Sequence, residues 1–149
     1  VTIRDMVGAH DLLREHLGIR RIFLLTGGSL GGQQALEWAV CKPDLIENMV
    51  LMSSNARHSP WGIAFNEAQR MAISADPTWR ENRDDAGREG MKAARAIAML
   101  SYRNYRTYEK TQADDTDEKT GDFRAASYQR YQGLKLAKRF DAFSYWVLS

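Results

Sequence analysis

The first part of the chain alternates between helical and strand patterns. Residues 2–18 carry apolar side chains at helical spacing, after a Thr-x-x-Asp capping signature and before a terminal glycine. Residues 21–27 and 48–54 are short, continuous apolar runs, which are typical of strands buried on both faces of a parallel sheet. A second helical stripe lies between these runs and ends at Pro43. This order predicts a parallel α/β sheet with helical crossovers.

The rest of the chain has no convincing strand pattern. Ser59 and Pro60 form a good start for a helix that ends before Pro77. Three further segments follow: a helix expected at 88–105, a polar and exposed loop expected at 110–122, and aromatic-rich helical sequence from 123 to the end. The second part is therefore predicted to be helical.

Two domains follow from these patterns. Residues 1–58 are expected to form part of an α/β core, and residues 59–149 a helical region inserted on it. Two strands are fewer than the four to six or so of a doubly wound sheet, so we expect the core to be incomplete. The chain also begins at Val1 and not at a methionine, which agrees with a piece of a longer protein.

The composition of the chain excludes several classes of function. The chain has 149 residues, of which 44% are hydrophobic, and its 21 basic and 19 acidic residues leave a net charge of +2. Without a basic block, we expect neither nucleic acid nor an anionic membrane as a partner. No apolar stretch approaches the ~20 residues of a membrane span, and no signal peptide is evident, so the expected location is the cytoplasm.

The single cysteine, Cys41, lies in a predicted helix with no redox or metal-ligand spacing around it. We therefore expect a buried, reduced thiol and no metal site.

The motif G-x-S-x-G occurs at Gly27, Ser29 and Gly31, between a predicted strand and a predicted helix. In such an elbow the serine backbone is strained, and the two glycines are expected to remove Cβ atoms that would collide across the turn. The backbone N–H of Leu30, at the start of the helix, would be an oxyanion donor. Gly32 would let the helix approach the sheet closely. A tight turn with an incidental serine is the alternative.

Two phosphate-binding motifs are excluded by spacing. A P-loop requires lysine and Ser/Thr where Gln33 and Gln34 stand. A dinucleotide fingerprint requires glycine at the position of Ser29.

A nucleophilic serine needs a base, and the chain has three histidines. His10 and His16 precede the serine and are interpreted as ordinary helix residues. His58 follows the second strand, whereas the histidine of this fold class normally lies far downstream. Either His58 has an unusual role or the base lies outside this chain.

The chain resembles the homoserine O-acetyltransferase family, which has an α/β-hydrolase fold. The resemblance runs over nearly the whole chain in five blocks in family order: VTIRDMV (1–7), GGSLGGQQALEWA (27–39), SSNARHSPWGIAFNEAQRMAI (53–73), ARAIAMLSYR (94–103) and YQRYQGLKLAKRFDAFSY (128–145). Leu30 and Phe143 depart from the methionine and asparagine usual in the family.

The resemblance implies that acetyl-CoA acylates Ser29 and that the hydroxyl of homoserine then attacks the acyl-serine. It implies that Arg95 and Tyr102 hold the homoserine, that residues 59–149 form a helical lid, and that no cofactor is bound. The aspartate and histidine of the triad lie outside the matched stretch in that family. A central fragment is thus implied, with the remainder of the parent chain as its partner and a homodimer formed through the lid helices.

Without the family resemblance, the role of Arg95 has two interpretations. It interrupts an apolar helical face between Met91 and Ala98, where a guanidinium could bind a carboxylate or extend to solvent. Taken alone, Tyr102 would be interpreted as a core residue. The aromatic residues near the C-terminus are interpreted as packing or as a dimer surface, namely Tyr128, Tyr131, Phe140, Phe143, Tyr145 and Trp146.

Three functions stay open at this point: an acyltransferase, a serine esterase with the same elbow, and a fragment that acts only through interactions. The donor, acetyl-CoA or succinyl-CoA, and the acceptor, homoserine or serine, are also open.

Overall fold

The computed structural model describes residues 1–116 and 118–149. It divides into two compact units, Val1–His58 and Ser59–Ser149, each of which is described by itself. Asp117, which belongs to the loop predicted at 110–122, lies outside the described residues.

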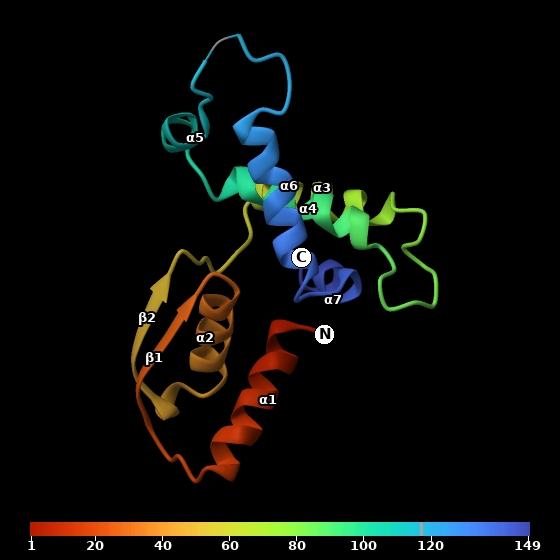
Figure 1. Ribbon diagram of the computed structural model, residues 1–149. Coiled ribbons are helices and arrows are strands. Elements are labelled where there is room, and N and C mark those ends of the chain that lie inside the picture. The colour runs from red at the N-terminus through yellow and green to blue at the C-terminus, as the bar shows by residue number, and fades with distance from the viewer. Residues whose placement is uncertain (117) are drawn as a thin grey trace. The chain divides into compact units, whose positions relative to one another are not determined.

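The first unit contains a pair of parallel strands and two long helices. Its elements are α1 (Ile3–His16), β1 (Ile22–Gly28), α2 (Leu30–Cys41), a short 3-10 turn η1 (Pro43–Leu45) and β2 (Ile46–Met52). Leu24 pairs with Asn48 and Gly28 with Met52. Helix α2 packs on both strands, and α1 packs on α2 (Figure 1). The predicted parallel α/β arrangement is confirmed.

Local signals explain α1 and its ends. The Thr2 hydroxyl accepts from the backbone N–H of Asp5, and the Asp5 carboxylate accepts from that of Thr2 at 2.7 Å. Gly18 has a φ of 66° just after the helix, a conformation that L-residues with a Cβ disfavour. The predicted capping box and terminal glycine are therefore confirmed.

The strands are not buried on both faces, as their apolar runs predicted. Phe23 is 72% exposed and Val50 is 47% exposed. The reason is that the described sheet has two strands and only α2 packs against it.

The expectation that Cys41 is buried is wrong, because this residue is exposed. It is the last residue of α2, and its Sγ lies 3.5 Å from Oε1 of Glu37.

The second unit consists of five helices in the described residues: α3 (Pro60–Ser74), α4 (Arg88–Ser101), α5 (Tyr105–Gln112), α6 (Arg124–Ala137) and α7 (Ala142–Leu148). Its core lies where α3, α4, α6 and α7 meet, and is built from Ile73, Met91, Ala94, Leu136, Ala137 and Ala142. At Gly90 a Cβ would lie 2.6 Å from the backbone oxygen of Ala72, so α3 and α4 cross at a distance that only glycine permits.

The helix predicted over residues 88–105 is two helices. Helix α4 ends at Ser101, and the side chain of Asn104 then caps α5 by accepting from Thr107 N–H at 2.8 Å. Helix α5 extends to Gln112, so the first residues of the predicted loop at 110–122 are helical.

A buried carboxylate joins the end of α3 to the start of α4. Asp76 is 9% exposed, and its oxygens accept from Thr78 N–H at 2.9 Å, Thr78 Oγ1 at 2.7 Å and Gly90 N–H at 2.9 Å. Burial raises the pKa of Asp76, but the hydrogen bonds from Gly90 and Thr78 outweigh it and hold the pKa below its usual value.

Candidate active site

Ser29 forms a sharp turn between β1 and α2. Its φ of 54° and ψ of −122° lie where a residue with a Cβ is strained, as the elbow motif predicted. Its backbone N–H donates to the carbonyl oxygen of Met52 at 3.0 Å, and its own carbonyl accepts from Gly32 N–H at 2.9 Å. The side chain is exposed and does not cap the helix. The Ser29 hydroxyl is thus available for chemistry.

The three glycines around Ser29 have different structural roles. A Cβ at Gly27 would lie 2.2 Å from the carbonyl oxygen of Gly31, and one at Gly32 would lie 2.5 Å from Cβ of Ser54. A Cβ at Gly31 would meet nothing within 4 Å in the described chain. The collision expected at Gly27 and the close packing expected at Gly32 are confirmed. The expectation for Gly31 is wrong, because the tight approach is between the Cα of Gly27 and the backbone of Gly31.

The backbone N–H groups of Leu30 and Gly31 lie at the start of α2, next to Ser29. Neither Leu30 N–H nor Gly31 N–H has an acceptor within the part of the chain that the structure describes. Both groups belong to the positive end of the helix dipole. An oxyanion formed next to Ser29 would accept hydrogen bonds from these two N–H groups.

Ser54, two residues after the end of β2, is a supporting residue that the sequence reasoning missed. Its Oγ donates to the carbonyl oxygen of Ser29 at 2.9 Å, and it occupies the space that Gly32 leaves open. The only sequence signal is a small polar residue at the end of the second apolar run.

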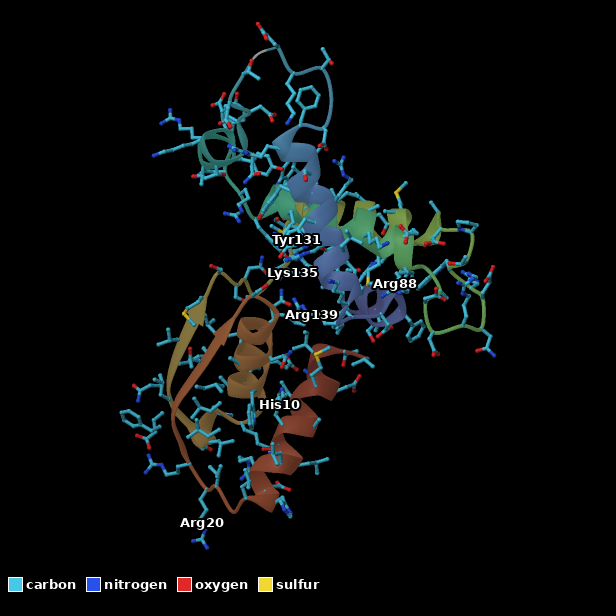
Figure 2. All side chains as sticks on the ribbon, viewed as in Figure 1. His10, Arg20, Arg88, Tyr131, Lys135 and Arg139 are labelled. Carbon is cyan, nitrogen blue, oxygen red and sulfur yellow. The ribbon has the colours of Figure 1, made fainter. Side chains whose placement is uncertain are left out.

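None of the three histidines forms a hydrogen bond with Ser29 in the described residues. His10 on α1 faces α2 (Figure 2), where its Nε2 lies 2.8 Å from Oε1 of Gln34 and its ring stacks on Trp38. His16 lies in the last turn of α1, and His58 is exposed after β2. In the described residues, no histidine of the first unit is therefore hydrogen-bonded to the serine as a base.

Arg95 and Tyr102 lie together in the second unit. The guanidinium carbon of Arg95 is 5.4 Å from the centroid of the Tyr102 ring. Arg95 is half-buried on α4, between Met91 and Ala98, which are both 1% exposed. No carboxylate lies within 4.0 Å of Arg95 in the described residues. A cation held by an aromatic ring and free of an anion can bind a carboxylate.

Tyr102 is 66% exposed, so its interpretation as a core residue, which rested on the helical pattern alone, is wrong. It follows the last residue of α4, where the helix ends and its ring turns onto Arg95.

The half-buried Tyr145 and the buried Gln69 form a polar pair that local patterns did not reveal. The Tyr145 hydroxyl donates to Oε1 of Gln69 at 2.5 Å, which links α7 to α3. Burial raises the pKa of Tyr145 to about 12; Tyr102 adds to the increase and the positive charge of Arg95 opposes it.

A cavity of about 500 Å³ also lies in the second unit, and Trp79, Arg80, Phe143 and Trp146 are among the residues that line it. Neither Arg95 nor Tyr102 lines it, so this cavity is distinct from their pair.

Residues 1–146 match the model of a family described as having the alpha/beta hydrolase fold. The chain therefore belongs to the alpha/beta hydrolase family, which agrees with the elbow and the parallel strands.

Within that family, the chain is similar to proteins named homoserine O-acetyltransferase. It is 54% identical to the one from Cyclobacterium marinum, a match over 100% of this chain and 42% of that protein. Among solved structures, homoserine O-acetyltransferase from Staphylococcus aureus superposes with a TM-score of 0.77 and 31% identity, over 99% of this chain and 40% of that one. The acetyl esterase MekB superposes with a TM-score of 0.72 and 28% identity, over 89% and 40%. The chain thus spans about two fifths of the length of the relatives it matches.

No helix in the described ranges is both long enough and apolar enough to cross a membrane.

Proposed function

We propose that this chain carries the nucleophile and part of the acceptor site of a homoserine O-acetyltransferase. The observation that carries the proposal is the strained, exposed Ser29 beside two N–H groups that have no acceptor in the described residues, in a chain 54% identical to a protein of that name. In this mechanism Ser29 Oγ attacks the thioester carbonyl of acetyl-CoA, and Leu30 N–H stabilises the oxyanion. Coenzyme A leaves as the thiol, and the hydroxyl of homoserine then attacks the acyl-serine.

The amino-acid acceptor is the reason to favour a transferase over an esterase. Homoserine carries a carboxylate, whereas a simple ester does not. Arg95 is a cation without an anionic partner in the described residues, and its planar guanidinium matches a carboxylate in a two-pronged geometry. We assign Arg95 and Tyr102 to the binding of that carboxylate.

The catalytic base is proposed to come from sequence outside these 149 residues. Support for this is that no histidine bonds to Ser29 in the described chain and that the chain spans 42% of its Cyclobacterium relative. The isolated chain is then expected to be inactive, since a triad without its base loses most of its catalysis. The same proposal includes methionine biosynthesis as the pathway, the cytoplasm as the location, and a homodimer through the helices of the second unit.

The test is acetyl transfer by the intact parent protein. Acetyl-CoA is incubated with and without homoserine, and O-acetylhomoserine and free acetate are both measured. We expect the ester as the main product with homoserine present, and no product of either kind from Ser29→Ala. Succinyl-CoA and serine, as alternative donor and acceptor, are expected to react more slowly.

Arg95→Lys separates the acceptor site from the nucleophile in the same assay. Lysine keeps the charge but loses the planar fork, so we expect the KM for homoserine to rise about tenfold with little change in acyl-enzyme formation. If the unaltered protein releases only acetate, the proposed transferase function is wrong and a serine esterase function takes its place.

A further inference from the structure

The turn between α4 and α5 carries Tyr102. It consists of residues 102–104, after α4 ends at Ser101 and before α5 begins at Tyr105. Neither Tyr102 nor Arg103 forms a backbone–backbone hydrogen bond in the described residues. The direction in which the Tyr102 ring leaves this turn therefore depends on side-chain contacts.

Arg103 makes the side-chain contact that links this turn to α6. Its Nη2 group donates to the hydroxyl oxygen of Tyr128 at 2.8 Å, and its guanidinium carbon lies 5.8 Å from the centroid of the Tyr128 ring. This is the only side-chain hydrogen bond of Arg103 within the described part of the chain. Removal of either partner therefore removes one defined interaction.

The Tyr128 side chain is held in place by α5. Tyr128 is half-buried on α6, and its ring meets the ring of Tyr108 on α5 edge to face, with centroids 6.1 Å apart. The Tyr108 hydroxyl donates to the carbonyl oxygen of Ala125, also on α6, at 3.4 Å. The Tyr128 hydroxyl therefore has a fixed place beside the turn.

The next residue of α6 contacts the part of α4 that carries Arg95. The Nε2 group of Gln129 donates to the carbonyl oxygen of Ala96 at 3.1 Å, and Ala96 directly follows Arg95. The two helices also approach closely at Gly133, where a Cβ would lie 2.9 Å from the carbonyl oxygen of Lys92. Two consecutive residues of α6 thus hold the two chain segments that carry the proposed acceptor residues.

Ring packing accounts for the Tyr128 ring and not for its hydroxyl bond. A phenylalanine at position 128 would meet Tyr108 in the same way. The bond from Arg103 is exposed, so we expect it to contribute little to the free energy of unfolding. A small rotation of the turn, in contrast, would move the Tyr102 ring away from Arg95, and such displacements weaken binding strongly.

We propose that Arg103, held by the Tyr128 hydroxyl, is a positioning residue that fixes the turn between α4 and α5. In this arrangement Tyr102 lies over Arg95 in the orientation that receives the carboxylate of the amino-acid acceptor. The inference rests on the proposed function. It assigns to α6 a part in the choice of an amino acid over water.

The experiment uses the intact protein and separates its two half-reactions. In Tyr128→Phe we expect the KM for homoserine to rise about fivefold and the share of acetyl-CoA lost to hydrolysis to increase. The rate of acyl-enzyme formation without acceptor should stay within about twofold.

Variants of Arg103 test the same bond from its other side. Arg103→Met removes the donor and is expected to reproduce the changes seen in Tyr128→Phe. Arg103→Lys keeps a donor, so it should restore part of the affinity for homoserine. The double variant with methionine and phenylalanine should be no worse than either single one, because both remove one interaction.

Each variant has a matched control. Tyr131→Phe removes an exposed hydroxyl three residues further along α6, which has no hydrogen bond in the described residues. Arg106→Met removes the same charge from α5, where the exposed side chain has no hydrogen bond or ion pair in the described residues. Both controls should leave the KM for homoserine unchanged. Denaturant midpoints of all variants show whether each one is folded.

Three results would overturn the inference and leave the proposed function standing. One is a KM for homoserine in Tyr128→Phe and Arg103→Met equal to that of the controls, which would make the bond structural only. Another is an equal fall in both half-reactions. The third is a large rise of the KM in Arg103→Met with none in Tyr128→Phe, which would mean that Arg103 acts through its own charge.

A different result would refute the proposed function itself. If the unaltered parent acetylates itself from acetyl-CoA but never transfers to homoserine, the acceptor site and the positioning role are both wrong.

Discussion

At the scale of single residues, the elbow holds Ser29 in a conformation that costs a residue with a Cβ about 1–3 kcal/mol. Hydrogen bonds from β2, from Ser54 beyond it and from the start of α2 offset this strain. The backbone N–H of Ser29 donates to Met52, and its carbonyl accepts from Ser54 and Gly32. The strained turn is therefore held from both sides.

The two motif glycines should respond differently to alanine. Gly27→Ala places a Cβ against the carbonyl oxygen of Gly31, and we expect it to lower the free energy of unfolding by about 3 kcal/mol. Gly31→Ala meets nothing within 4 Å and should change it by less than about 1 kcal/mol. Urea denaturation of the intact protein measures both. Equal losses would show that the G-x-S-x-G spacing matters for a reason other than this collision.

The sequence predicted the elbow well, because its signals are local. A buried-strand pattern, a glycine pair and the start of a helix suffice to place Ser29. The pair of Tyr145 and Gln69 could not be predicted, since the two residues lie on α7 and α3 and meet only through the packing of the second unit.

At the scale of elements, the prediction succeeded where caps and prolines mark the ends of helices. Helix α3 begins at Pro60, after Ser59 accepts from Gly62 N–H at 3.2 Å. Helix α5 was missed because it has no buried residue, so it carries no apolar periodicity to detect. The exposure of the strands was missed because an apolar run shows that a strand can be buried. It does not show which elements cover that strand.

The junction of α3 and α4 depends on Asp76 and should be sensitive to acid. The folded-state pKa of Asp76 is below its usual value, so the carboxylate stabilises the fold above about pH 4, and this contribution is lost as the pH falls further. Asp76→Asn should lower the free energy of unfolding at neutral pH by roughly 1–3 kcal/mol. The stability of this variant should also fall less steeply as the pH is lowered.

Denaturant midpoints between about pH 7 and about pH 3 test this dependence. Asp84→Asn is the control, because Asp84 is exposed and forms no hydrogen bond or ion pair in the described residues. A parallel pH profile for Asp76→Asn and the unaltered protein would contradict the role of Asp76.

At the scale of the whole molecule, the chain contains a candidate nucleophile and a candidate acceptor site, and no histidine is hydrogen-bonded to that serine in the described residues. The first unit carries Ser29, and the second carries Arg95 and Tyr102. The relative from Cyclobacterium marinum, at 54% identity, extends well beyond the match, which covers 42% of its length. The proposed mechanism therefore belongs to the parent protein.

The most direct test of the central claim is the site of acylation. The intact protein is mixed with acetyl-CoA in the absence of homoserine, quenched in acid, digested and analysed by mass spectrometry. We predict an acetyl group on Ser29, which disappears when homoserine is added before the quench and never forms in Ser29→Ala. An acetyl group on another residue, or one retained in Ser29→Ala, would contradict the account.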